Sequence, residues 1–208
     1  FGFHLLAARF GFRVPPLPPF FFLALCWTSP SDLTCPASPS RTISDPIIIY
    51  TDAEGSSGIG AVLSSSSSTL WFGGFIPESI GKALHPRKTQ IFPFEVIAIW
   101  AAIMAFKPHL TNRHVLFFVD NQSALASSAK GTTTASDVQE IISSMWDFIQ
   151  HSGIHAVFRY VPSKLNLADP PSRGKAPIVG TQVPLRLRWE LLLRLLPERL
   201  SRSTQPPR

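Results

Sequence analysis

The chain has 208 residues, of which 45% are hydrophobic, and a formal net charge of +6. This length suits one domain with tails, because domains typically have about 100 to 150 residues, and the apolar content is enough for a packed core. The positive charge favours an acidic partner such as nucleic acid or a membrane surface. Two cysteines, Cys26 and Cys35, are too few to build a metal cage of thiolates.

The first 46 residues are rich in Phe, Pro and Ser, and we expect them to form a poorly ordered leader. The apolar run 20–27 is far shorter than the roughly 20 residues that a membrane span needs. A signal-peptide core of this length is an alternative, but no small-residue cleavage site follows it. The segment is also compatible with a remnant of a larger upstream protein. We expect no membrane partner.

Three strands are predicted next, in a row. Residues 46–52, PIIIYTD, form an apolar run that ends at Asp52. Residues 58–65 and 69–76 continue as two strands of an antiparallel meander, and the serine run 64–68 supplies the turn between them.

A helix and a fourth strand follow the meander. Residues 92–106 place apolar side chains on one helical face, with Pro93 and Glu95 in the first turn. The run 114–120, HVLFFVD, is typical of a buried strand and ends at Asp120.

Two further helices and a fifth strand complete the pattern. Residues 121–129 can start a helix directly after the fourth strand. Ser136 with Gln139 is a capping-box signature for a helix that runs to about residue 149. Residues 155–161 then read as a strand.

The final segments are less regular. Residues 162–174 contain Asp169 as their only acid. The basic tail 175–208 contains a short predicted helix that Pro197 interrupts. The order of elements predicts an α/β domain over residues 47–174, a mixed five-stranded sheet flanked by helices, with irregular tails at both ends.

Four acids stand at the ends of predicted elements: Asp52, Glu95, Asp120 and Asp169. Each also has a simpler explanation, because Asp120 can cap a helix, Glu95 can favour a first turn, and Asp169 can sit in a turn. Together they favour a site for hard cations such as Mg²⁺ or Mn²⁺, because clustered carboxylates repel one another unless cations lie between them. Two such ions about 4 Å apart are a known solution for cleaving phosphodiesters.

The motifs YTDAEGSSGIGAVL, FEVIAIWAAI, VDNQSAL and VPSKLNLADPPSR resemble, in order and spacing, the ribonuclease H domain that follows reverse transcriptase in retroelement polyproteins. The resemblance covers residues 46–174. It implies a ribonuclease H-like fold and hydrolysis of the RNA strand of an RNA–DNA hybrid. It also implies that the four acids bind two Mg²⁺ ions, for which Mn²⁺ can substitute.

The same resemblance implies a set of substrate contacts. Asn121 and Gln122 would reach the nucleic-acid backbone or the 2′ hydroxyls that mark RNA. Further grip would come from a reverse transcriptase polymerase partner or from scattered cations. These cations are Lys82, Arg87, Lys88, Lys164 and Arg173.

The sequence departs from the family pattern at two places. Glu54 stands where the family usually has a small hydroxyl residue, so an extra carboxylate flanks the site, where it would crowd the metals or act as an outer-shell ligand. The loop before Asp169 lacks the histidine that assists product release in many cellular members, and Lys164 could compensate electrostatically. We expect reduced turnover.

Three alternatives remain at this stage. The TDAEG opening also resembles 3′–5′ exonucleases, but these place Tyr or His before their last aspartate, where this chain has Lys164 and Leu165. Transposase and integrase domains order their acids differently. A catalytically inactive, retroelement-derived module that only binds nucleic acid is the third alternative.

Overall fold

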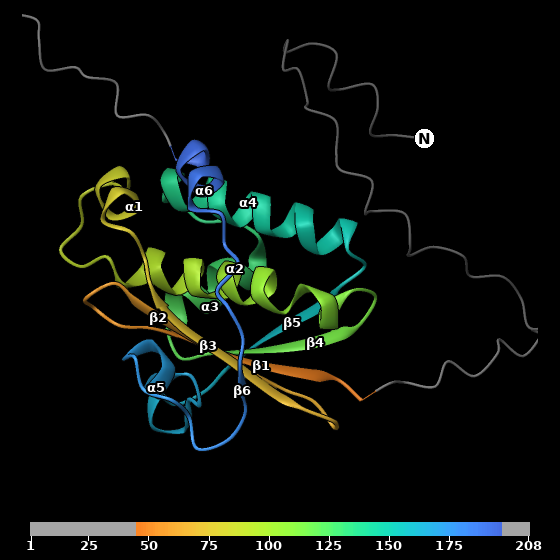
Figure 1. Ribbon diagram of the computed structural model, residues 1–208. Coiled ribbons are helices and arrows are strands. Elements are labelled where there is room, and N and C mark those ends of the chain that lie inside the picture. Colours follow the sequence, from red (N-terminus) through yellow and green to blue (C-terminus); the bar gives the residue numbers. More distant parts are fainter. Residues whose placement is uncertain (1–44, 197–208) are drawn as a thin grey trace, which may run out of the picture. The chain divides into compact units, whose positions relative to one another are not determined.

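The computed structural model describes residues 45–196 (Figure 1). Nearly all of the predicted leader, residues 1–46, therefore lies outside the described residues. The strands are β1 (Ile47–Ala53), β2 (Gly58–Ser64), β3 (Thr69–Phe75), β4 (His114–Val119), β5 (His155–Tyr160) and β6 (Thr181–Gln182). The helices are α1 (Glu78–Ala83), α2 (Ile91–Leu110), α3 (Gln122–Lys130), α4 (Ser136–His151), α5 (Asp169–Ser172) and α6 (Trp189–Leu195), and a 3-10 turn, η2, spans Ser163–Leu165.

The strands form one mixed sheet in the order β5-β4-β1-β2-β3-β6. β1, β2 and β3 are antiparallel neighbours, whereas β4 is parallel to β1 and β5 is parallel to β4. This arrangement confirms the predicted α/β architecture of a mixed sheet flanked by helices with one difference, because the sheet has six strands among the described residues rather than five. The sixth strand is only two residues long, and it forms where Thr181 and Gln182 pair with the edge of β3.

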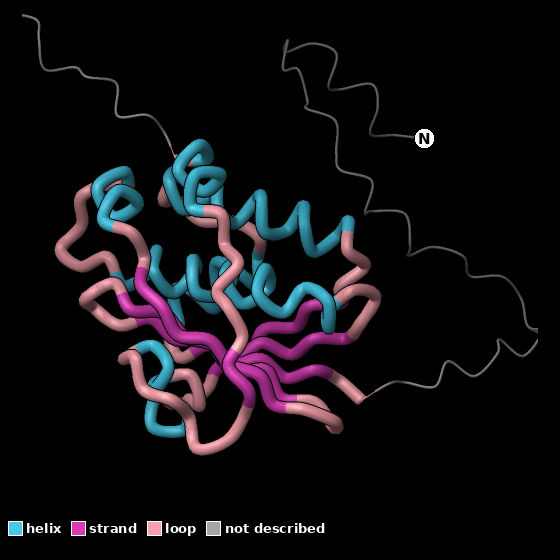
Figure 2. The backbone as a smooth tube through the Cα atoms, in the orientation of Figure 1, coloured by secondary structure: helices cyan, strands magenta, loops and turns pink. Residues whose placement is uncertain are grey.

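The helices lie mainly on one face of the sheet. Figure 2 shows α1, α2, α4 and α6 on that face, and the short α5 on the other. The tail beyond the predicted domain contributes to this layer, because α6 contacts α1 and α4. Its Leu192 is 1% exposed and belongs to the hydrophobic core.

Helix α2 is the central helix of the core. It begins at Ile91 and is apolar on nearly all sides, with thirteen buried residues. By length and composition alone this helix could cross a membrane, but 72% of its most apolar window is buried inside the fold, as in the core helix of a soluble protein. Because α2 packs against β1 and β2, it holds Glu95 beside the end of β1.

The start of α4 differs from the predicted capping box. The N-cap position is Ala135, which has no side chain that can cap, and Ser136 is already the first helical residue. Gln139 instead turns back to the preceding loop, where its Oε1 accepts hydrogen bonds from the Thr133 N–H at 2.8 Å and the Thr132 hydroxyl at 3.1 Å. The spacing of Ser136 and Gln139 therefore predicted the helix correctly, but Gln139 bonds to the preceding loop and not to the N-cap residue.

A buried ion pair ties the loop before α2 to α4. Arg87 Nη1 donates to Asp137 Oδ2 at 2.8 Å, and the His85 backbone N–H donates to the same oxygen at 2.8 Å. The Asp137 side chain is fully buried. Burial opposes its ionisation, but the hydrogen bonds from Arg87 and His85 outweigh this effect and hold the pKa of Asp137 below its usual value.

Candidate active site

Three of the four predicted acids come together at one edge of the sheet. β1 and β4 are parallel neighbours in which Thr51 pairs with Val119, so the next residue on each strand, Asp52 and Asp120, stands at the same edge. Glu95 reaches this edge from α2. One carboxylate oxygen from each of Asp52, Glu95 and Asp120 lies within 4.8 Å of the other two.

This group of three carboxylates is largely shielded from solvent. Glu95 is 2% exposed and Asp52 is 5% exposed, while Asp120 is half-buried. Glu95 lies in the second turn of α2, because the helix starts four residues before it, so it does not act as a first-turn charge. Its Oε2 is buried without a hydrogen-bond partner, although a buried oxygen normally has one.

Burial and mutual repulsion raise two of the pKa values. Burial is the main reason why the pKa of Glu95 rises to about 9, and the charges of Asp52 and Asp120 raise it further, against a backbone hydrogen bond from Ala53. Burial likewise raises the pKa of Asp52 to about 6, although the hydrogen bond from Ser172 opposes the rise. Without a cation, Glu95 therefore keeps its proton at neutral pH, where a glutamate with an ordinary pKa would be ionised.

Asp120 is not the cap of the following helix. That position belongs to Asn121, whose Oδ1 accepts the backbone N–H groups of Ser123 and Ala124 at 3.0 and 3.1 Å. The carboxylate of Asp120 is therefore left to the acidic group. Gln122 follows at the exposed first position of α3.

Asp169, the fourth predicted acid, lies beside the group of three rather than in it. It begins α5, its side chain is 41% exposed, and its Oδ1 accepts a hydrogen bond from Arg173 Nε at 3.0 Å. Its charge still contributes to the raised pKa of Asp52. Asp169 thus stands on the rim of the site, paired with Arg173.

Two further predicted residues surround this rim. Lys164 is exposed in η2 and lines, together with Asp169, a cavity of about 340 Å³. Glu54 follows β1 in a tight turn whose backbone closes with Gly58, and its charge raises the pKa of Arg173 less than Asp169 does. Among the described residues, the group of three acids does not include Glu54.

Two polar residues that contact the site, Ser172 and Asn166, were not predicted from the sequence. Ser172 donates a hydrogen bond from its Oγ to Asp52 Oδ2. Asn166 Nδ2 donates to the Thr51 carbonyl oxygen at 2.9 Å and lies 3.4 Å from Asp52 Oδ1. These bonds join residues more than 110 positions apart, so no local pattern could have indicated them.

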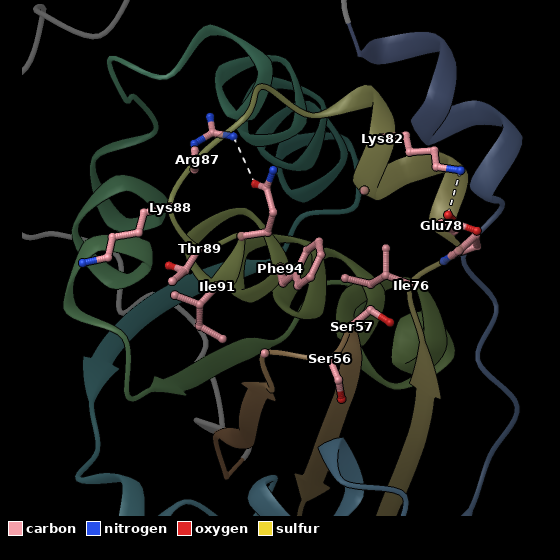
Figure 3. A pocket seen from close by; sticks show the side chains of 14 residues that line it. Ser56, Ser57, Ile76, Glu78, Lys82, Arg87, Lys88, Thr89, Ile91 and Phe94 are labelled. Carbon is pink, nitrogen blue, oxygen red and sulfur yellow. Dashed lines mark hydrogen bonds and ion pairs between the residues drawn. The ribbon is translucent and has the colours of Figure 1, made fainter.

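A larger cavity of about 750 Å³ is lined by residues that include Gly55, two residues after the end of β1, and Phe94, the residue before Glu95 in the sequence. Figure 3 shows Lys88 and Thr89 at one end of this cavity and the ion pair of Lys82 with Glu78 at the other. Among residues 45–196, Lys88 makes no ion pair, so its charge is available to an anion.

The residues present fit a divalent cation. Three carboxylates with ligand atoms within 4.8 Å are a set of hard oxygen donors. The unpartnered Oε2 of Glu95 would gain a partner in such an ion. A cation would also remove the repulsion that raises the pKa values of Asp52 and Glu95.

The chain is similar to solved structures of RNase H1 proteins. No protein-family model matches the chain, and no curated protein matches it. LC11-RNase H1, isolated from compost by a metagenomic approach, matches with 19% identity and a TM-score of 0.46, over 62% of this chain and 96% of that one. The structure of the same protein in complex with an RNA/DNA hybrid matches with 20% identity and a TM-score of 0.47, over 62% of this chain and 95% of that one. RNase H1 from the halophilic archaeon Halobacterium salinarum NRC-1 matches with 18% identity and a TM-score of 0.44, over 62% of this chain and 96% of that one.

Proposed function

We propose that this chain is a metal-dependent endonuclease of the ribonuclease H type that hydrolyses the RNA strand of RNA–DNA hybrids. The observation that carries the proposal is the group formed by Asp52, Glu95 and Asp120, whose ligand atoms lie within 4.8 Å of one another. Buried carboxylates in such a group are costly unless they serve a cation. Sites of perturbed pKa are therefore candidates for function.

Asp52, Glu95 and Asp120 would hold the divalent cations, and Asp169 would join them from the rim. We expect Mg²⁺, with Mn²⁺ as a substitute, because all four ligands are carboxylates. When bound, a pair of such ions activates water for in-line attack and stabilises the leaving oxygen. Glu95 must lose its proton first, because its pKa near 9 keeps it neutral at pH 7.

The substrate would be bound mainly through its phosphates. Lys88 supplies a cation without an ion pair among the described residues, and it lies at one end of the cavity of about 750 Å³ (Figure 3). Lys164 and Arg173 would add positive charge near Asp169. Phosphate contacts of this kind provide most of the affinity for nucleic acid.

Selectivity for RNA requires contacts to the 2′ hydroxyl, which can both donate and accept a hydrogen bond. Gln122 is exposed beside Asp120 and offers both an amide donor and a carbonyl acceptor. Asn121 uses its Oδ1 for the helix cap, so its role in substrate binding is restricted to its amide nitrogen. We assign the contact to Gln122 first.

The retroelement origin is part of the same proposal. It is supported by the four sequence motifs in their order, and it implies that residues 47–174 work beside a reverse transcriptase polymerase domain. Adding a separately purified polymerase domain should then increase cleavage of the hybrid by this chain. An unchanged cleavage rate would remove the support for this partner.

The decisive experiment is cleavage of a labelled RNA–DNA hybrid beside matched RNA and DNA duplexes. We expect cutting of the RNA strand in the hybrid alone, with Mg²⁺ or Mn²⁺ and not with EDTA. Asp120→Asn should reduce the rate by about 1,000-fold, because metal ligands supply several kcal/mol of transition-state stabilisation. Asp147→Asn, an exposed aspartate of α4, is the matched control and should leave the rate unchanged.

Cutting that persists in EDTA, or in the Asp120→Asn variant, would show that this site does not perform the reaction. Salt-sensitive binding of the hybrid without any cutting would instead favour an inactive nucleic-acid-binding module.

A further inference from the structure

Helix α5 is unusually close to the sheet, and this closeness depends on glycines. A Cβ atom built on Gly60 would fall 2.7 Å from two carbon atoms of Pro171. Cβ atoms on Gly58 and Gly73 would meet the backbone oxygens of Ser172 and Pro171. Because real Cβ atoms do not approach so closely, only glycines let α5 lie against β2 and β3 at this depth.

This approach brings Ser172 to the first carboxylate of the site. The Ser172 side chain is almost fully buried, at 1% exposure. Its Oγ lies within hydrogen-bond distance of two acceptors, Asp52 Oδ2 and the Asp169 carbonyl oxygen, and the contact with Asp52 is the shorter one. A hydroxyl has a single hydrogen, so the geometry favours donation to the carboxylate.

Asn166 approaches the other oxygen of the same carboxylate. Its Nδ2 donates to the Thr51 carbonyl oxygen at 2.9 Å and is 3.4 Å from Asp52 Oδ1. Its own Oδ1 accepts the Ala168 N–H at 3.1 Å, which fixes the amide orientation. Asn166 is 5% exposed, so water does not compete freely for these bonds.

We infer that Ser172 and Asn166 are positioning residues that hold the Asp52 carboxylate in the orientation in which it binds a divalent cation. Each oxygen of Asp52 has one donor from this pair, and a carboxylate oxygen has a second lone pair that remains available to a cation. Outer-shell partners of this kind orient ligands and strengthen metal binding. The inference rests on the metal site of the proposed function.

This role differs from simple anchoring of the C-terminal segment. If Ser172 only held α5 on the sheet, its loss would weaken the fold, and the metal affinity would follow only through unfolding. If it acts through Asp52, its loss must weaken metal binding in a protein that is still folded. The effect must also disappear when Asp52 is no longer a carboxylate.

The test is Mn²⁺ binding by the full chain, measured from the electron paramagnetic resonance signal of free Mn²⁺. Four proteins are compared: wild type, Ser172→Ala, Asp52→Asn and the double variant. We expect Ser172→Ala to weaken binding by about 10-fold, the lower end of the range for outer-shell partners. Asp52→Asn should weaken it more, and the double variant should bind no more weakly than Asp52→Asn alone.

Three additions make the result unambiguous. Ser128→Ala replaces another fully buried serine, in α3, whose Oγ has no hydrogen-bond partner, and should not change the affinity. Ser172→Cys leaves no empty space at this position and has a much weaker donor, so it should reproduce the loss even if alanine impairs folding. The urea midpoints of the same four proteins are also measured in EDTA, without metal. The shifts of the midpoint caused by Ser172→Ala and by Asp52→Asn should not add in the double variant, because both changes remove the same hydrogen bond.

The outcomes separate the two proposals. If Asp52→Asn binds Mn²⁺ as wild type does, the metal site itself is wrong. If Asp52→Asn binds weakly but Ser172→Ala and Ser172→Cys bind normally, the metal site stands and the positioning role is overturned. The positioning role is also overturned if the effects of Ser172→Ala and Asp52→Asn on the urea midpoint simply add.

Discussion

The raised pKa of Glu95 predicts how the stability of the metal-free protein depends on pH. The pKa rises from an ordinary value of 4.5 to about 9 in the folded protein. Between these values the native state holds a proton that the unfolded chain has released, so the contribution of Glu95 to stability is fully present below about pH 4.5 and is lost as the pH rises toward 9. Glu95→Gln removes this proton while keeping the size of the side chain.

The magnitude follows from the linkage of protons to folding. One retained proton changes the free energy of unfolding by about 1.4 kcal/mol per pH unit. Asp52, with a pKa of about 6, has largely ionised by about pH 6.5 in both states. From there to about pH 8.5 the wild type should lose about 3 kcal/mol through Glu95, an upper limit because relaxation of the site would reduce it.

Urea unfolding in EDTA, followed by tryptophan fluorescence, measures this difference. The wild type should lose stability across the window, whereas Glu95→Gln should lose about 3 kcal/mol less. Glu140→Gln, an exposed residue of α4, should behave like the wild type. Saturating Mg²⁺ should stabilise the wild type more at high pH, because the ionised carboxylate binds the cation. Equal slopes for the wild type and Glu95→Gln would refute the reasoning.

Four further predictions concern the fold and the substrate. Arg87→Ala leaves Asp137 as a buried, unpaired charge and should lower the free energy of unfolding by about 3 kcal/mol in urea at pH 7. Gly73→Ala pushes α5 from the sheet and should cost about 1 to 3 kcal/mol in thermal melts, whereas Gly55→Ala, which has open space, should not. A chain that ends at residue 174 loses the buried side chains of Leu187, Leu192 and Leu196 and should be less stable by at least about 4.5 kcal/mol in urea. A tolerated truncation would instead support a domain boundary there. Hybrid binding should weaken steeply with salt in a filter assay, and a flat response would contradict a phosphate-binding surface.

Local patterns in the sequence were sufficient for the main elements of the fold. β1 and β4 are runs of β-branched and aromatic residues, with Asp52 as the penultimate residue of β1 and Asp120 directly after β4, and α2 is a long apolar segment with proline in its first turn. These patterns arise because a buried strand or helix must be apolar along its own length. Asp52 and Asp120 could be placed at strand ends for the same reason. The short elements α1 and β6 were missed, since six residues with one buried side chain and two paired residues give no periodic signal.

Only the tertiary structure decided which groups act together. The proximity of Asp52, Glu95 and Asp120, and the place of Asp169 on the rim with Arg173, follow from the packing of α2 and α5 on the sheet. The bond from Ser172 to Asp52 joins residues 120 positions apart. Such contacts depend on the register of strands and the close approach of backbones, which no stretch of neighbouring residues encodes. The sequence by itself therefore determined the elements and the acids, while packing determined their burial, their pKa values and their partners.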